Sequence, residues 1–266
     1  MTGLRSGAKV AVAVMSALVT VASTPFVEAG ETTLYLKSGW FTWSEMINGS
    51  SFVKERGAMH ALGLAHSDDV SLLTVGERFE VWGGNLDYDG HDLTGTFTLK
   101  SDTSYLGTRE EVSLSARMPR QAAFSFEPLL ALGHKFWVRT RSGEDWNIFY
   151  GKVGAAGEYV TGGASFFLKG GAILPIYTRN HVSLSDSGLQ DVVLEPKQRV
   201  TSFAEGGIKT GAFTVSVEYE ALEFGQSPKV PTHSLSSSQG SVVINGYAFQ
   251  PASSSSNVSL KLSYTF

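Results

Sequence analysis

The stretch NVSLKLSYTF at residues 257–266 alternates strictly between apolar and polar side chains, and it ends on an aromatic residue. A period of two residues places successive side chains on opposite faces of a β-strand. One face of this segment carries Val258, Leu260, Leu262, Tyr264 and Phe266, and the other carries Ser259, Lys261, Ser263 and Thr265. The segment therefore predicts a strand with one apolar face and one polar face.

The same alternation recurs upstream, for example at residues 213–220, where Phe213, Val215, Val217 and Tyr219 share one face. Helical periodicity is absent. We predict an all-β chain of about ten strands, with eight to twelve allowed by the uncertainty of strand ends. The predicted strands are 33–45, 57–66, 70–85, 105–118, 122–140, 146–155, 165–179, 199–209, 211–226 and 257–266.

The connections between these strands fall into two length classes. The short ones are His66–Asp69, Pro119–Gln121, Lys209–Gly211 and the looser Ala155–Gly163. The long ones are Met46–Arg56, Leu86–Ser104, Asn180–Lys197 and the Ser-rich Gln226–Ser256, with the short Ser142–Glu144 as an exception among them. Short and long connections alternate, as they do in membrane barrels with short turns at one rim. Both chain ends then lie at the short-turn rim, which requires an even number of strands.

The first 29 residues have the three parts of a secretory signal peptide. Arg5 and Lys9 precede an apolar run at 10–24, and small residues occupy the expected cleavage region at Val27–Ala29. The run is short for a spanning helix, although an N-terminal membrane anchor is the alternative. We therefore expect two parts, a signal peptide at 1–29 and a β-domain at 30–266.

Composition narrows the function classes. Without Arg5, Lys9 and Glu28 the chain has 19 basic and 24 acidic residues, and no Lys/Arg-rich run occurs, so we expect no nucleic-acid partner. There is no cysteine. No stretch of the mature chain approaches 18 consecutive apolar residues, so a chain that crosses a membrane must cross it as strands.

The last strand resembles the C-terminal sorting signal of bacterial outer-membrane barrels, with Tyr264 and Phe266 as the assembly signal. Many members have glycine at the place of Lys261. From Thr33 to Phe266 the chain resembles the small single-chain β-barrels of Gram-negative outer membranes as a class. The resemblance implies a transmembrane antiparallel up-and-down barrel in the outer membrane, with loops at the cell surface. Its implied partners are the barrel-assembly machinery, outer-membrane lipid, lipopolysaccharide and an extracellular ligand at the loops. It implies no catalytic residue.

The orientation of the strands decides between two kinds of barrel. In a membrane barrel the apolar face meets lipid, whereas a soluble lipocalin-like barrel that binds a small ligand has it inside. The membrane orientation puts a charged network into the lumen. Its predicted members are Arg78, Glu80, Arg109, Glu111, Arg117, Glu127, Lys135, Arg139, Lys152, Lys169, Glu205, Lys209, Glu218, Glu220 and Lys261. Such a narrow, charged lumen predicts occlusion.

Three local features accompany this map. Trp40, Trp43 and Trp146 fall near strand ends, so we expect them in an aromatic girdle at the membrane interface, while Trp82 and Trp137 fall on the lumen phase. Glu77 falls among lipid-facing residues, which predicts a bulge near Gly76. Phe41 and Trp43 fall out of phase with Leu34 and Leu36, which predicts a break at residues 38–39.

Little in the sequence indicates catalysis. The six histidines form no zinc spacing, and no Gly-x-Ser-x-Gly motif occurs. Asp87, Asp89 and Asp92 supply carboxylates that could bind Ca²⁺, but the segment lacks the closing bidentate Glu of a calcium loop, and a hydrated loop tip is the favoured interpretation. We expect a non-catalytic porin-like or adhesin-like barrel without a cofactor. The alternative is a rim hydrolase, either lipid-modifying or omptin-like with Asp87, Asp89, His91 and Asp186 in its cleft.

Overall fold

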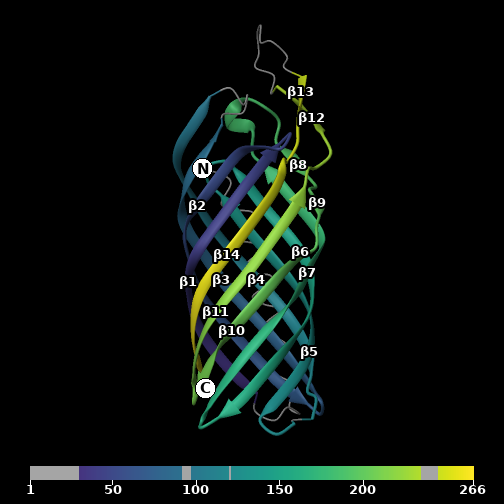
Figure 1. The fold of residues 1–266 in the computed structure, drawn as a ribbon. Helices are drawn as coiled ribbons and strands as arrows, with labels where there is room; N and C mark the ends of the chain where they lie inside the picture. Colours follow the sequence, from purple (N-terminus) through teal and green to yellow (C-terminus); the bar gives the residue numbers. More distant parts are fainter. Residues whose placement is uncertain (1–29, 92–96, 120, 235–244) are drawn as a thin grey trace.

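The computed structural model describes residues 30–91, 97–119, 121–234 and 245–266, and it is almost entirely β-structure (Figure 1). Ten long strands form the barrel wall. They are β1 (Glu31–Ile47), β2 (Ser50–Val70), β3 (Leu73–His91), β4 (Thr98–Ala116), β5 (Phe124–Arg139), β6 (Glu144–Thr161), β7 (Ala164–Val182), β10 (Thr201–Thr210), β11 (Phe213–Gly225) and β14 (Ala252–Thr265). The expected signal peptide at 1–29 lies outside the described residues.

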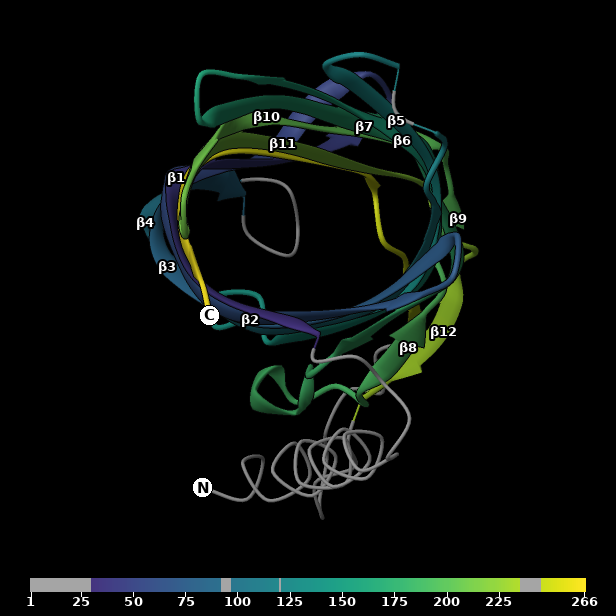
Figure 2. The same cartoon turned by 90° about the horizontal axis from the view of Figure 1, so that it is seen from below.

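The wall closes on itself. Each strand pairs antiparallel with its sequence neighbour, β14 pairs with both β1 and β11, and β7 pairs with β10. Seen along its axis, the barrel is a continuous ring (Figure 2). Closure satisfies the backbone groups that an open sheet edge would leave exposed. The predicted ten-strand antiparallel barrel is confirmed.

Five short elements of the described chain lie at one end of the barrel, which we call the decorated end or decorated rim, and the opposite end is the undecorated rim. They are η1 (Ser185–Ser187), β8 (Val192–Leu194), β9 (Lys197–Gln198), β12 (Val230–His233) and β13 (Asn245–Ala248). The end of the chain lies at the opposite rim (Figure 1). None of the described segments is a helix long and apolar enough to cross a membrane.

The outer and inner faces of the wall differ in polarity. On the outer face Leu260 exposes 57% of its surface, and Leu36, Leu132 and Val217 are similarly exposed. On the inner face Lys37 exposes only 6%. This arrangement is the reverse of a soluble protein, in which ionised groups face water and leucines are buried. The soluble barrel with an apolar interior is therefore wrong, and the outer face is suited to lipid.

The strands extend further than predicted at the decorated end. The predicted loop Met46–Arg56 is wrong, because β1 and β2 continue through it and are joined by a two-residue turn. The turn residues Asn48 and Gly49 have φ of 51° and 80°. Asn-Gly is a preferred sequence for such a turn, because both residues adopt positive φ readily, and this explains why the strands continue to residues 47 and 50. The predicted loop Leu86–Ser104 is also wrong, because β3 continues to His91 and β4 begins at Thr98.

Two predicted irregularities do not occur. Tyr35, Lys37, Phe41, Trp43 and Glu45 all face inward, so β1 has no break at residues 38–39. Its only register shift is between Glu45 and Met46 in the pairing with β2. No bulge lies near Gly76, and Glu77 shares the outer phase of β3 with Val75 and Val81.

The aromatic girdle has a different composition from the predicted one. Trp43 and Trp146 are fully buried in the lumen, so their assignment to the girdle is wrong, whereas Trp40 lies on the outer face and is 54% exposed. The phase of each strand explains the difference, because Trp43 and Trp146 alternate with outward residues. Aromatic side chains do gather on the outer face near the undecorated rim: Phe124, Phe126, Tyr159, Phe166, Phe213, Tyr264 and Phe266.

Candidate functional site

The lumen is the candidate site, and its middle is filled by a layer of ion pairs. Arg109 donates from Nη2 to Oε1 of Glu220 at 2.6 Å, and Lys135 binds the same oxygen. Lys37 Nζ lies 2.7 Å from Glu80 Oε2 and 2.8 Å from Glu218 Oε1. The side chains come from β1, β3, β4, β5 and β11, so these contacts cross the lumen from opposite walls.

Further pairs extend this layer. Arg78 Nη2 lies 3.0 Å from Glu218 Oε2, and Lys152 Nζ donates to Glu111 Oε2 at 2.6 Å. Lys261 pairs with Glu205 nearer the undecorated rim. Every partner is nearly or fully removed from solvent. Buried charges are tolerated when they are paired with opposite charges, and each charge named in this layer has such a partner.

A second cluster lies toward the decorated end, around Arg139. The guanidinium of Arg139 contacts Glu45, Glu55 and Glu144 at 2.7–2.9 Å. Indole nitrogens add donors: Trp43 Nε1 donates to Glu45, and Trp146 Nε1 donates to Glu144, each at 2.8 Å. One cation therefore holds three carboxylates in this cluster.

Sequence reasoning missed the acidic half of this cluster. Glu55 lay in a predicted loop and Glu144 in a predicted turn, while Glu45 was the last residue of a predicted strand. The signal was present in the alternation of residues 53–59, where Val53, Glu55 and Met59 share one phase. Extending that strand past the Asn-Gly turn would have placed Glu55 in the lumen.

Aromatic rings fill the lumen around the Arg139 cluster. Trp137 stacks on Trp146 with a centroid separation of 5.4 Å, and Trp43 packs edge-on against Trp146 at 5.2 Å. Phe224 contacts both Trp43 and Trp146. Trp82, which the sequence places on the lumen phase together with Trp137, packs on Trp137 with a centroid separation of 6.0 Å. Two layers therefore fill the lumen, the ion pairs at its middle and the aromatic rings toward the decorated end.

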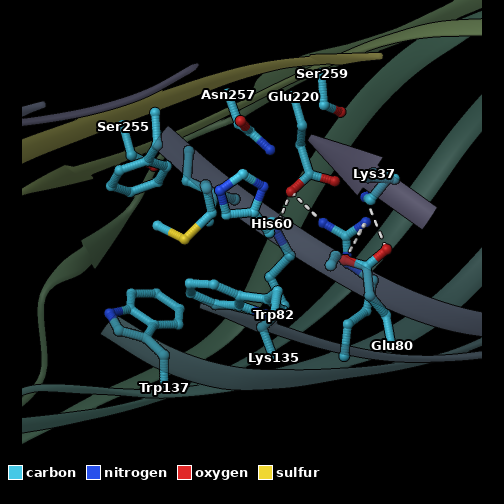
Figure 3. Close-up of a pocket in the computed structure, with 15 residues that line it drawn as sticks. Lys37, His60, Glu80, Trp82, Lys135, Trp137, Glu220, Ser255, Asn257 and Ser259 are labelled. Carbon is cyan, nitrogen blue, oxygen red and sulfur yellow. Dashed lines mark hydrogen bonds and ion pairs between the residues drawn. The ribbon is translucent and has the colours of Figure 1, made fainter. Parts of the chain in front are cut away.

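Little space remains between these layers. A cavity of about 50 Å³ lies where they meet, lined by Lys37, Glu80, Trp82, Arg109 and Trp137 among others (Figure 3). That volume admits only a few water molecules. A wider vestibule of about 320 Å³ lies at the undecorated end and includes Glu127, Glu205, Lys209 and Lys261.

The remaining predicted network members lie apart from the ion-pair layer. Arg117 is at the undecorated rim, where it pairs with Asp69 and is substantially exposed, so its placement in the lumen is wrong because β4 ends at Ala116. Glu127 accepts a hydrogen bond from Ser115 at 3.3 Å. Lys169 has the inward phase of β7 but forms no ion pair among the described residues. Lys209 Nζ lies 3.8 Å from Glu31 Oε2.

The acidic segment around residue 89 lies outside the lumen. Asp87 and Asp89 alternate with the buried Leu86 and Tyr88, so they point away from the barrel axis. His91 contacts the carbonyl oxygen of Phe52 through Nδ1 at 2.9 Å and stacks on its ring. Asp92 lies outside the described residues, as does the side chain of Asp186. Within the described ranges, no three acidic, His or Cys side chains are grouped as a metal site would require.

Comparisons with known proteins concern the fold. No protein-family model and no curated protein matches the sequence. The structure is similar to the outer membrane protease OmpT from Escherichia coli, with a TM-score of 0.54, 10% identity and coverage of 92% of this chain and 99% of that one. It is also similar to the transport unit of the autotransporter AIDA-I from Escherichia coli, with a TM-score of 0.42, 14% identity and coverage of 95% and 97%. The closed ten-strand wall, its apolar exterior and the similarity to OmpT agree that the chain has the fold of the small bacterial outer-membrane β-barrels.

Proposed function

We propose that this protein is an integral outer-membrane scaffold that conducts no large solutes and presents the decorated rim at the cell surface for binding. The filled lumen carries the proposal. A pore for solutes needs a continuous aqueous path, whereas here ion pairs and stacked indoles leave a cavity of about 50 Å³ between them. Water and small ions are the most that such a lumen would pass.

The decorated rim supports the binding half of the proposal. Leu184, Val192 and Leu194 form a small apolar cluster of their own, against which Val230 and Ala248 pack. Gln190 N donates to the carbonyl oxygen of His233 at 2.9 Å. This bond joins the connection between β7 and β10 to the connection between β11 and β14. Strands β8 and β12 lie outside the ring of the wall (Figure 2). Loops that pack on one another outside the ring of the wall are suited to presenting a defined surface.

Recordings in planar bilayers test the occluded lumen. The purified, refolded chain should give no large, stable conductance steps, with a porin reconstituted by the same procedure as the positive control. Large stable steps would refute occlusion and leave the barrel fold intact.

Lipid, lipopolysaccharide and the barrel-assembly machinery are the other partners that we propose, because the apolar exterior needs lipid and the chain needs insertion. The proposal includes no catalytic step and no cofactor. Hydrolysis of peptides and lipids by intact cells should be the same for the wild-type chain and for the triple variant D87N/D89N/H91N. Activity that the triple variant loses would establish a rim hydrolase instead.

A further inference from the structure

The small cavity in the lumen has an unusual lining. Lys37, Glu80, Arg109, Lys135 and Glu220 supply its charged groups, and Trp82 and Trp137 add indole rings to the same lining. Figure 3 labels Lys37, Glu80, Lys135, Glu220 and the two indoles around the cavity. Strand β14 contributes Ser255, Asn257 and Ser259. The cavity is therefore bounded by strands from opposite sides of the barrel.

Positive charge exceeds negative charge around this cavity. Its lining has three cations, Lys37, Arg109 and Lys135, and two carboxylates, Glu80 and Glu220. The connected ion-pair layer has the same imbalance. Arg78 and Lys152 join its cations, and Glu111 and Glu218 join its carboxylates, which gives five against four. An uncompensated positive charge in a buried site favours the approach of an anion.

Hydrogen-bonding atoms at the cavity lack partners within the described protein. Arg109 is buried, and its Nε and Nη1 form no hydrogen bond with the described protein, although Nη1 lies 3.6 Å from Glu218 Oε1 and Nη2 is bonded to Glu220. Ser259 Oγ is also buried without a partner. Buried guanidinium groups and hydroxyls are normally satisfied, so such a group indicates a further ligand or ordered solvent.

We propose that this cavity binds one small monovalent inorganic anion of the chloride type. The charge excess of one matches a single negative charge. The volume of about 50 Å³ admits a halide but excludes organic anions such as gluconate. Arg109 Nε and Nη1 and the Ser259 hydroxyl supply donors, and the ammonium groups of Lys37 and Lys135 supply charge. The bound anion would complete the packing of the ion-pair layer and stabilise the closed barrel.

A titration of thermal stability tests the proposal on the full refolded chain in detergent. The unfolding temperature is followed by heat-modifiable gel migration in sodium chloride and in sodium gluconate at equal ionic strength. Chloride should raise that temperature along a saturating curve, and gluconate should give only the response to ionic strength that both salts share. Coincident curves for the two salts would overturn the proposal.

Matched variants locate the effect. K135M removes a cation from the cavity lining, whereas K261M removes a lumen cation that pairs with Glu205 outside the cavity. The saturating response should be lost in K135M and retained in K261M, and its retention in both would count against the site. S259A, which removes a donor and no charge, replaces K135M if that variant does not fold, and it should shift the midpoint to higher chloride.

Crystals of the wild-type chain grown in sodium bromide give a direct answer. An anomalous peak within hydrogen-bond distance of Arg109 Nε or Nη1 is expected. Ordered water without anomalous signal at that position, together with coincident titration curves, would show that the cavity holds solvent only.

Discussion

Arg139 on β5 and Glu45 on β1 meet across the lumen, with Nη1 of the arginine 2.9 Å from Oε1 of the glutamate. The two residues are 94 positions apart in the sequence, and three strands separate β1 from β5 in the wall. Because Glu55 and Glu144 bind the same guanidinium, Arg139 ties together strands β1, β2, β5 and β6. The ion pairs of the lumen thus brace the wall from within.

Replacement of Arg139 should strongly destabilise the barrel. R139M leaves three buried carboxylates without their cation, and removal of one partner from a buried pair typically lowers the free energy of unfolding by about 3–5 kcal/mol. Urea unfolding of the protein in lipid vesicles, followed by tryptophan fluorescence, measures the change. The control is R199M, whose partner Glu223 is exposed and whose loss should lower stability by only about 0–1 kcal/mol. Equal effects of the two variants would contradict the bracing role.

The positions of two tryptophans give a second prediction. Trp146 packs in the lumen between Trp43, Trp137 and Phe224, so W146A should lower the free energy of unfolding by about 3–5 kcal/mol through the cavity it creates. Trp40 faces outward, and W40A should cost much less. The comparison, made by urea unfolding in the same vesicles, would go the other way if Trp146 belonged to the lipid interface.

The sequence predicted the barrel because alternation is a local property that each strand carries on its own. Strand number, apolar exterior and most lumen charges followed from that phase. The predictions that were wrong concern residues whose facing cannot be decided from alternation alone. Trp43 is out of phase with the apolar Leu34 and Leu36, and it shares its phase with Lys37 and Gly39, so the continuous inward phase of β1 does not stand out from hydrophobicity alone. The pairing of Arg139 with three distant carboxylates depends on barrel closure and register, which no single strand encodes.

A hydrogen-bonded pair on the outer face offers a third prediction. Glu110 and His134 point outward on adjacent strands β4 and β5, with His134 Nδ1 3.0 Å from Glu110 Oε2. In H134L the carboxyl group loses its partner beside lipid, so the variant should be less stable than the double variant E110L/H134L. A double-mutant cycle on the free energy of unfolding measures the coupling, for which we expect about 0.5–2 kcal/mol. Additive single effects would show that the pair contributes nothing.

The hairpin between β1 and β2 provides a fourth prediction. Gly49 has a φ of 80°, a conformation that side chains other than glycine rarely adopt, and a Cβ there would meet nothing within 4 Å. G49A should therefore destabilise the barrel by backbone strain alone, by about 1–2 kcal/mol in urea unfolding. N48D should be tolerated, because Asp-Gly suits the same turn. A harmless G49A would show that the turn relaxes at little cost.

The last residue should matter for assembly in cells more than for the stability of the finished barrel. Phe266 is 71% exposed on the outer face, and its ring packs edge-on against Tyr264 at 5.1 Å. Its backbone nitrogen donates to the carbonyl oxygen of Thr32 at 2.9 Å, one bond beyond the 14 paired positions of β14 and β1. Deletion of Phe266 thus removes one terminal hydrogen bond, and refolding in detergent should be almost unchanged. If Tyr264 and Phe266 are read by the assembly machinery, the same deletion should sharply reduce the heat-modifiable protein recovered from outer membranes. F266W retains an aromatic end and should restore that recovery, whereas full recovery of the deletion variant would show that this strand does not act as the assembly signal.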